Sequence, residues 1–120
     1  MFFIMDISSF KKSLGDAGPP PGLTPYLESL WYDAAENWTR SHELIQDLED
    51  NLAAWIHAYL HRKEGDLWNA DYWYRKAGKK RPAIGLEQEW EILVDYCLRQ
   101  FPGLIQKTNF ILFVPCRPFF

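Results

Sequence analysis

The chain has 120 residues, of which 48% are apolar and 24% are charged, so its composition is that of one globular domain rather than of a disordered polymer. Thirteen Lys and Arg stand against 16 Asp and Glu, and the net charge of −3 argues against a protein that coats nucleic acid. Two cysteines are too few for a disulfide scaffold or a four-thiolate zinc site, and no apolar run approaches the roughly 18–20 residues of a membrane span.

The aromatic residues divide the chain into a central domain and two tails. All six Trp and all six Tyr lie between Tyr26 and Tyr96, whereas all eight Phe lie outside that stretch. We therefore predict a helical domain over residues 24–101, preceded by a flexible leader rich in Pro and Gly over residues 1–23. Residues 102–120 are predicted to be a hydrophobic tail without a role of its own, with a docking strand or a membrane-touching segment as alternatives. Because the sequence begins without the basic region of a secretory signal, we expect a cytoplasmic protein.

Apolar residues recur with helical spacing throughout the predicted domain, so the expected fold is all-α. Thr24 and Pro25 are a typical start of a helix, since Thr accepts hydrogen bonds from free amides and Pro tolerates the first helical position. The short connections predict antiparallel helical hairpins. The predicted helices cover residues 25–35, a segment that begins after Asn37 or Thr39, and residues 51–63, 67–77 and 86–101.

The fourth of these helices has the clearest packing pattern. Leu67, Ala70, Tyr74 and Ala77 are spaced three, four and three residues apart, and Gly78 follows as a C-terminal cap. The small alanines of this stripe allow a neighbouring helix to approach closely.

Further small and aromatic residues extend this stripe into a repeat-like pattern. Six residues lie at offsets of zero, seven, twelve, sixteen, nineteen and twenty-four: Ala58, Gly65, Ala70, Tyr74, Ala77 and Pro82. The pattern resembles the tetratricopeptide repeat, whose period is roughly 34 residues. The preceding pair of helices offers similar residues at corresponding places, although the step from Ser41 to Ala70 is shorter than that period. Those residues are Ser29, Tyr32, Ser41, Ile45 and Leu48.

The resemblance implies about two tetratricopeptide-like repeats, with the helix over residues 86–101 capping the open end of the second hairpin. The stretch from Leu27 to about Leu98 is also similar to short uncharacterised proteins of this type, which implies the same fold and no activity.

The resemblance further implies a groove lined by the first helix of each pair. Aromatic anchors beside Arg and Lys suit the recognition of a peptide. We therefore expect a non-catalytic interaction module, without a cofactor, that binds a peptide or helix of a partner protein. The alternative is that its aromatic residues pack against the last helix or a tail. Self-association of the chain stays open. The predicted partner-binding residues are Tyr26, Leu30, Asp33, Trp55, Tyr59, Arg62 and Lys63.

Two histidines suggest a different function. His57 and His61 lie four residues apart, which places them on one helix face, and Glu64 or His42 is the candidate third ligand of a shared metal ion. No HExxH signature accompanies them, and packing against the second and fourth helices is the competing interpretation. A metal- or small-ligand-binding protein, including a small metal-dependent enzyme, is therefore the alternative function.

The remaining chemical groups predict no activity. The sequence contains no P-loop, no dinucleotide-binding glycine pattern and no nucleophile elbow, so we do not expect an enzyme. Cys97 falls on an apolar helix face as an inert thiol, and Glu89 is expected to lie largely off that face. The basic run from Arg75 to Arg81 is interpreted as a favourable helix C-terminus, with a nucleic-acid patch as the less favoured alternative.

Overall fold

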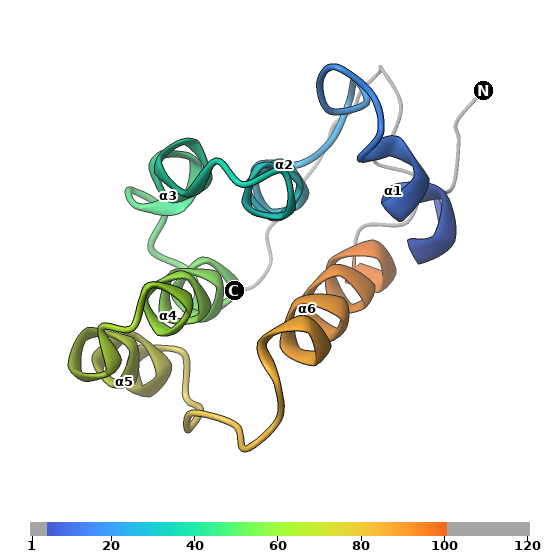
Figure 1. The fold of residues 1–120 in the computed structure, drawn as a ribbon. Helices are drawn as coiled ribbons and strands as arrows, with labels where there is room; N and C mark the ends of the chain where they lie inside the picture. Colours follow the sequence, from blue (N-terminus) through green and yellow to red (C-terminus); the bar gives the residue numbers. More distant parts are fainter. Residues whose placement is uncertain (1–4, 101–120) are drawn as a thin grey trace.

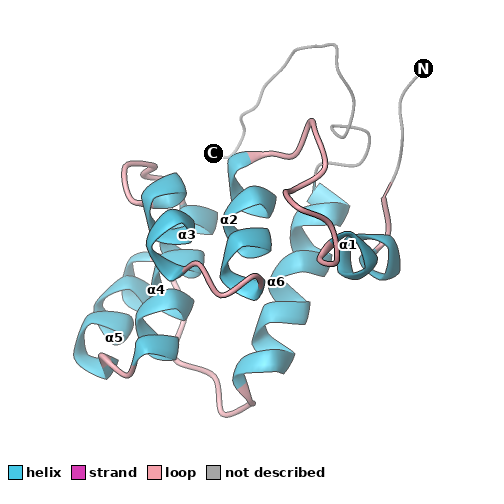
Figure 2. Cartoon of the chain, turned by 45° about the horizontal axis from the view of Figure 1, so that its top comes forward, coloured by secondary structure: helices cyan, strands magenta, loops and turns pink. Residues whose placement is uncertain are grey.

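Two helical hairpins lie side by side, and two further helices pack along one side of them (Figure 1). The computed structural model describes residues 5–100, and every regular element in that range is an α-helix (Figure 2). The all-α fold predicted from the sequence is therefore confirmed. None of the helices within residues 5–100 has the length and apolar character needed to cross a membrane. The helices are α1 (Ile7–Ser13), α2 (Pro25–Ala34), α3 (Trp38–Ile45), α4 (Asn51–Glu64), α5 (Leu67–Lys76) and α6 (Leu86–Gln100).

The hairpin helices begin at capping residues. The side chains of Thr24, Asn37, Asp50 and Asp66 each accept a hydrogen bond from the backbone amide three residues further along the chain. Helix α4 ends at Gly65, whose φ of 92° lies in the left-handed region that glycine adopts without strain. Because these signals are local, the hairpin helices lie close to where the sequence predicts them.

Each hairpin is closed by small buried residues. In the first, the Ser29 hydroxyl donates to the Ser41 carbonyl at 2.8 Å, and the Ser41 hydroxyl donates to the Ser29 carbonyl at 2.7 Å. In the second, Ala58 and Ala70 are fully buried together with Tyr74. Ala70 and Tyr74 of the stripe predicted for α5 therefore do face α4, whereas Leu67, the first residue of that stripe, is 42% exposed.

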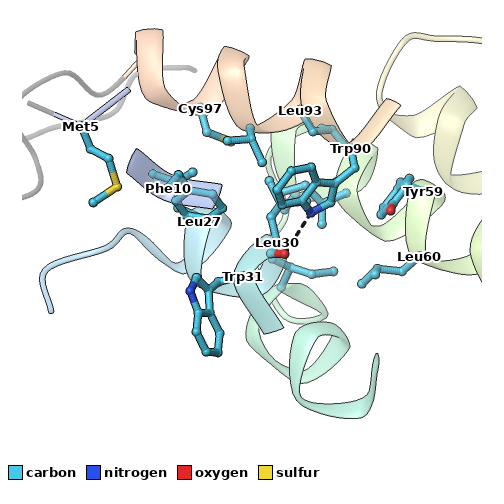
Figure 3. Close-up of a cluster of buried hydrophobic side chains, with 14 residues drawn as sticks. Met5, Phe10, Leu27, Leu30, Trp31, Tyr59, Leu60, Trp90, Leu93 and Cys97 are labelled. Carbon is cyan, nitrogen blue, oxygen red and sulfur yellow. Dashed lines mark hydrogen bonds between the residues drawn. The ribbon is translucent and has the colours of Figure 1, made fainter. Parts of the chain in front are cut away.

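Helix α6 lies along the inner side of both hairpins, against α2 and α4 (Figure 1). The Trp90 indole donates to the Leu30 carbonyl at 3.0 Å, and Leu93 and Cys97 are buried beside it (Figure 3). This position differs from the predicted cap on the open end of the second hairpin. The connection over residues 77–85 carries α6 across to a place where its apolar stripe is buried by two hairpins instead of one.

The leader also differs from its prediction. Helix α1 packs against α6, and the Phe10 ring is fully buried with its centroid 6.0 Å from that of Trp90. The Trp31 indole donates to the Ser13 hydroxyl at 3.0 Å, which ties α1 to α2. The part of the predicted leader around α1 therefore belongs to the core, since Ile7, Phe10 and Leu14 share one helix face. The predicted tail over residues 102–120 lies outside the described residues.

Candidate functional site

All three histidines of the chain meet where α3 packs against α4. His57 and His61 project from the same face of α4, one turn apart, and His42 reaches them from α3. Their ligand nitrogens all lie within 4.8 Å of one another, and His42 Nε2 lies 2.8 Å from His57 Nε2. The predicted pair is therefore joined by His42, which was one of the two candidates for the third ligand.

Tryptophan rings enclose this cluster. The Trp38 ring stacks on His42 with a centroid distance of 4.8 Å, and the Trp73 ring stacks on His57 at 3.9 Å. The Trp38 indole is itself held by a hydrogen bond to the Leu60 carbonyl at 2.9 Å. His57 and His61 are consequently buried, with only 6% and 7% of their surface exposed, whereas His42 is half-buried.

Glu64 orients one of the three rings. Its Oε2 atom lies 2.7 Å from His61 Nδ1, which leaves Nε2 as the free ligand atom of that histidine. A carboxylate bonded to the second nitrogen of a histidine is the usual support for a metal ligand, since it fixes the tautomer and raises the basicity of the ring. The cluster therefore has an outer layer as well as three donor atoms.

The environment keeps the imidazoles of His42 and His57 neutral. Burial, reinforced by the neighbouring His42 and His61, lowers the pKa of His57 to about 3. Burial and His61 also lower the pKa of His42, although Glu64 opposes that change. Near neutral pH these rings therefore carry lone pairs, and the neutral imidazole is the form that binds a metal ion.

A shallow cavity of about 380 Å³ opens beside the cluster. Trp38 and Glu64 line both the cavity and the histidine site, and Asp33, Glu36 and Lys63 complete its wall. None of the three histidines lines this cavity, so its contact with the site runs through Trp38 and Glu64.

The residues that we predicted to bind a partner form contacts with other residues of the same chain. Leu30, Asp33 and Tyr59 are buried, and the Asp33 carboxylate accepts hydrogen bonds from the Tyr59 hydroxyl at 3.0 Å and from Lys63 Nζ at 2.9 Å. The Tyr26 hydroxyl donates to Asp50 Oδ1 at 2.9 Å. Burial and the Asp33 charge raise the pKa of the Tyr59 hydroxyl well above its usual range.

Helix α6 occupies the side of α4 on which the groove was expected. The carboxylate of Glu89 accepts hydrogen bonds from Arg62 at 2.7 Å, from the Trp55 indole at 3.2 Å and from the Tyr74 hydroxyl at 2.7 Å. Arg62 also donates to the Ile84 carbonyl. A peptide would have to displace α6 to reach these residues.

Glu89 is the main residue that the sequence interpretation misplaced. It is 1% exposed, although it was expected to lie largely off the apolar face of its helix. The spacing held a usable signal, because Glu89 lies three residues after Leu86 and four before Leu93 and therefore falls inside the apolar stripe. The two tryptophans around the histidines were also missed as site residues, whereas Cys97 is buried as predicted and burial raises its pKa well above the usual range.

No family model matches the chain, and no curated protein or solved structure matches it either.

Proposed function

We propose that this protein binds a divalent transition metal, with Zn²⁺ as the first candidate, through His42, His57 and His61. The proposal depends on one observation: the three histidines of the chain, from two different helices, bring their ligand nitrogens within 4.8 Å of one another. Three protein nitrogens with a fourth position left for water or another ligand is a common arrangement for zinc.

The chemistry of the cluster supports this assignment. Imidazole nitrogens suit Zn²⁺, Cu²⁺, Ni²⁺ and Co²⁺ better than they suit Mg²⁺ or Ca²⁺, which prefer oxygen ligands. Burial disfavours the protonation of His42 and His57, so the neutral rings keep the lone pairs that a metal ion needs. His42 Nε2 and His57 Nε2 share a hydrogen bond of 2.8 Å, which a bound cation would replace by coordinating both nitrogens.

The helical frame of the site is consistent with a tetratricopeptide-like origin, which we include in the proposal. The interval between the N-cap residues Asn37 and Asp66 equals the interval between the small packing residues Ser41 and Ala70. Peptide binding at the inner side of α2 and α4 has less support than metal binding, because α6 fills that side.

Metal analysis of the full chain tests the proposal. Protein stripped with EDTA and titrated with ZnCl₂ is expected to bind one Zn²⁺ per chain by calorimetry and elemental analysis. Ligand binding to the folded state stabilises it by about 2.7 kcal/mol at a hundredfold excess over Kd, so the melting temperature should rise with added Zn²⁺. Co²⁺ should give the visible absorption of a tetrahedral nitrogen site.

His42→Gln is the most informative variant, because His42 is half-buried and is the only ligand from α3. It is expected to lose stoichiometric zinc while its circular dichroism stays unchanged. Glu43→Gln, an exposed change on the same helix, serves as the matched control and should bind like the parent protein. Glu64→Gln should weaken binding about 10- to 100-fold without abolishing it. Failure of the parent protein to bind zinc, or equal binding by His42→Gln, contradicts the proposal.

A further inference from the structure

His61 belongs to two groups of side chains that could hold a metal ion. The first group is the histidine site described above. The second joins His61 to Glu64 and Asp66, and one ligand atom from each of these residues lies within 4.8 Å of the others. Both carboxylates are exposed, whereas the His61 ring has only 7% of its surface exposed. His61 therefore connects the buried histidine site to two carboxylates at the surface.

The turn between α4 and α5 fixes Asp66 beside His61. The Asp66 amide donates to the His61 carbonyl at 2.9 Å, in the left-handed turn that ends α4. The Asp66 side chain accepts hydrogen bonds from the backbone and side-chain amides of Asn69, at 3.3 Å and 3.4 Å, as the N-cap of α5. Because the ends of two helices hold this residue, its carboxylate stays next to the last turn of α4. A carboxylate has about four lone-pair positions, so the cap leaves others for a ligand.

The charge of the two carboxylates is not neutralised by any Lys or Arg within residues 5–100. In that range Glu64 pairs with the His61 ring alone, and Asp66 forms no ion pair. The basic residues nearest to them in the sequence, Arg62 and Lys63, pair with carboxylates elsewhere. Glu64 also lines the shallow cavity, whose wall adds further carboxylates. A cation that approaches from this side is therefore attracted towards the Nδ1 atom of His61.

The rings around the histidine site restrict direct entry of an ion. The Trp73 ring stacks on His57 at 3.9 Å, and the Trp38 ring stacks on His42 at 4.8 Å. The Trp38 ring also meets His61 edge to face, with a centroid distance of 5.8 Å. A buried metal site needs an entry path, and removing a cation from water in one step is costly. An ion that first exchanges some of its water for exposed carboxylates avoids that single large step.

We propose that His61, Glu64 and Asp66 form an outer site for a divalent transition metal, through which the ion enters and leaves the histidine site. This inference rests on the proposed function, because it gives a path to the same metal ion. One imidazole nitrogen with carboxylate oxygens is a donor set that Zn²⁺ accepts. Since Nδ1 faces the outer site and Nε2 is left for the inner one, the transfer exchanges tautomers: Nε2 releases a proton and Nδ1 takes one up.

Stopped-flow measurements on the full chain with Co²⁺, followed by visible absorption at low ionic strength, test this inference. Asp66→Asn is the decisive variant, because asparagine is an equally good N-cap and the change removes the charge alone. It is expected to slow the association of Co²⁺ about fivefold or more. Release of Co²⁺, measured at EDTA concentrations that do not alter its rate, should slow by the same factor. A residue on the entry path lowers the barrier in both directions, so Kd should stay within about twofold of the parent value.

Asp50→Asn is the matched control, since Asp50 caps α4 in the same way and belongs to neither group of ligands. It should leave both rates unchanged. Parental rates in Asp66→Asn overturn the inference and would mean that the ion enters past the half-buried His42. Release that is unchanged or faster while association slows also overturns it, because Asp66 would then act by attraction at a distance or as a ligand of the final site. In both cases the parent still binds metal, whereas failure of the proposed function is seen as a parent protein that binds none.

Discussion

Both hairpins have small buried residues between their helices and a left-handed residue after the first helix, but the residues differ. The turn after α2 places Glu36 in the left-handed region with a φ of 67°, and the turn after α4 places Gly65 there, at the equivalent position of the second hairpin. Where the first hairpin joins its helices by reciprocal hydrogen bonds between Ser29 and Ser41, the second uses contact between alanines. The shared requirement is a small side chain at the crossing point, and either hydroxyl or methyl groups fulfil it.

The hairpins differ in the charged residue that each carries before its turn and in the partner of that residue. Asp33 of the first hairpin and Arg62 of the second lie at equivalent positions, each three residues before the left-handed turn residue, but they carry opposite charges. Asp33 is neutralised from within the hairpins by Lys63, whereas Arg62 neutralises Glu89 of α6. The second hairpin is therefore the one whose charge fixes α6 in place.

The largest effect is expected from Arg62→Met. Removing the guanidinium leaves the Glu89 carboxylate buried without its cation, and breaking a buried ion pair in this way costs about 3–5 kcal/mol in the free energy of unfolding. Urea denaturation followed by circular dichroism measures the loss. Arg40→Met, which breaks an exposed pair with Glu43, is the control and should cost less than about 1 kcal/mol. Equal effects of the two changes would show that the Glu89 pair is not the main support of α6.

A second test compares the two crossing points. Ala70→Leu inserts a larger side chain where α4 and α5 touch and should lower the free energy of unfolding by about 1–3 kcal/mol. At the equivalent position of the first hairpin, Ser41→Ala removes hydrogen bonds but keeps the volume small and should cost about 1 kcal/mol. If Ser41→Ala proves the more damaging, hydrogen bonding rather than close approach determines how these helices pack.

The junction between the hairpins predicts a pH dependence in metal-free protein. His57 has a pKa of about 3 when folded, against about 6.5 in the unfolded chain, so between these values only the unfolded chain takes up a proton. Its contribution to stability is complete above pH 6.5 and is lost as the pH falls towards 3, by about 2 kcal/mol between pH 7 and pH 5.

Thermal melts in EDTA across this pH range measure the change. Its origin lies in His57 together with the two rings that face it, His42 from α3 and His61 from the same helix. His57→Gln should flatten the profile between pH 5 and pH 7. An unchanged slope in that variant argues that other groups control the acid sensitivity.

The smallest effect should come from exchanging the turn residues. Glu36→Gly relieves a non-glycine residue in the left-handed region and should raise the free energy of unfolding by about 0.5–1 kcal/mol. Gly65→Ala should lower it by a similar amount, since an added Cβ meets no atom within 4 Å and only the backbone conformation is disfavoured. Differential scanning calorimetry can resolve both changes. Shifts of the same sign would mean that the two turns are not equivalent.

Local signals made the hairpins predictable from the sequence. The caps at Thr24, Asn37 and Asp66 and the left-handed Gly65 act within a few residues, so they can be read without knowing the tertiary structure. The same holds for the shared face of His57 and His61, which follows from their spacing alone.

The rest depends on contacts between distant residues. The apolar stripe on α6 indicates that one side of the helix is buried, but it does not identify the elements that bury it. The donors to Glu89 are Trp55, Arg62 and Tyr74, which are distant from it in the sequence. The stripe on α1 is short and precedes a segment rich in Pro and Gly, so composition outweighed periodicity there. The burial of the predicted groove could not be foreseen for the same reason, because it depends on where α6 packs.

The packing of α6 against both hairpins has a consequence for folding during translation. Phe10 and Trp90 are in contact although they come from opposite ends of the described chain. The Leu30 carbonyl accepts its hydrogen bond from the indole of Trp90, which is synthesised 60 residues later. During translation the hairpins can form as soon as they emerge, but their inner apolar side stays open until the segment around Trp90 has left the ribosome. During that interval the exposed apolar side makes the nascent chain most prone to aggregate, and it is also the surface that chaperones would bind.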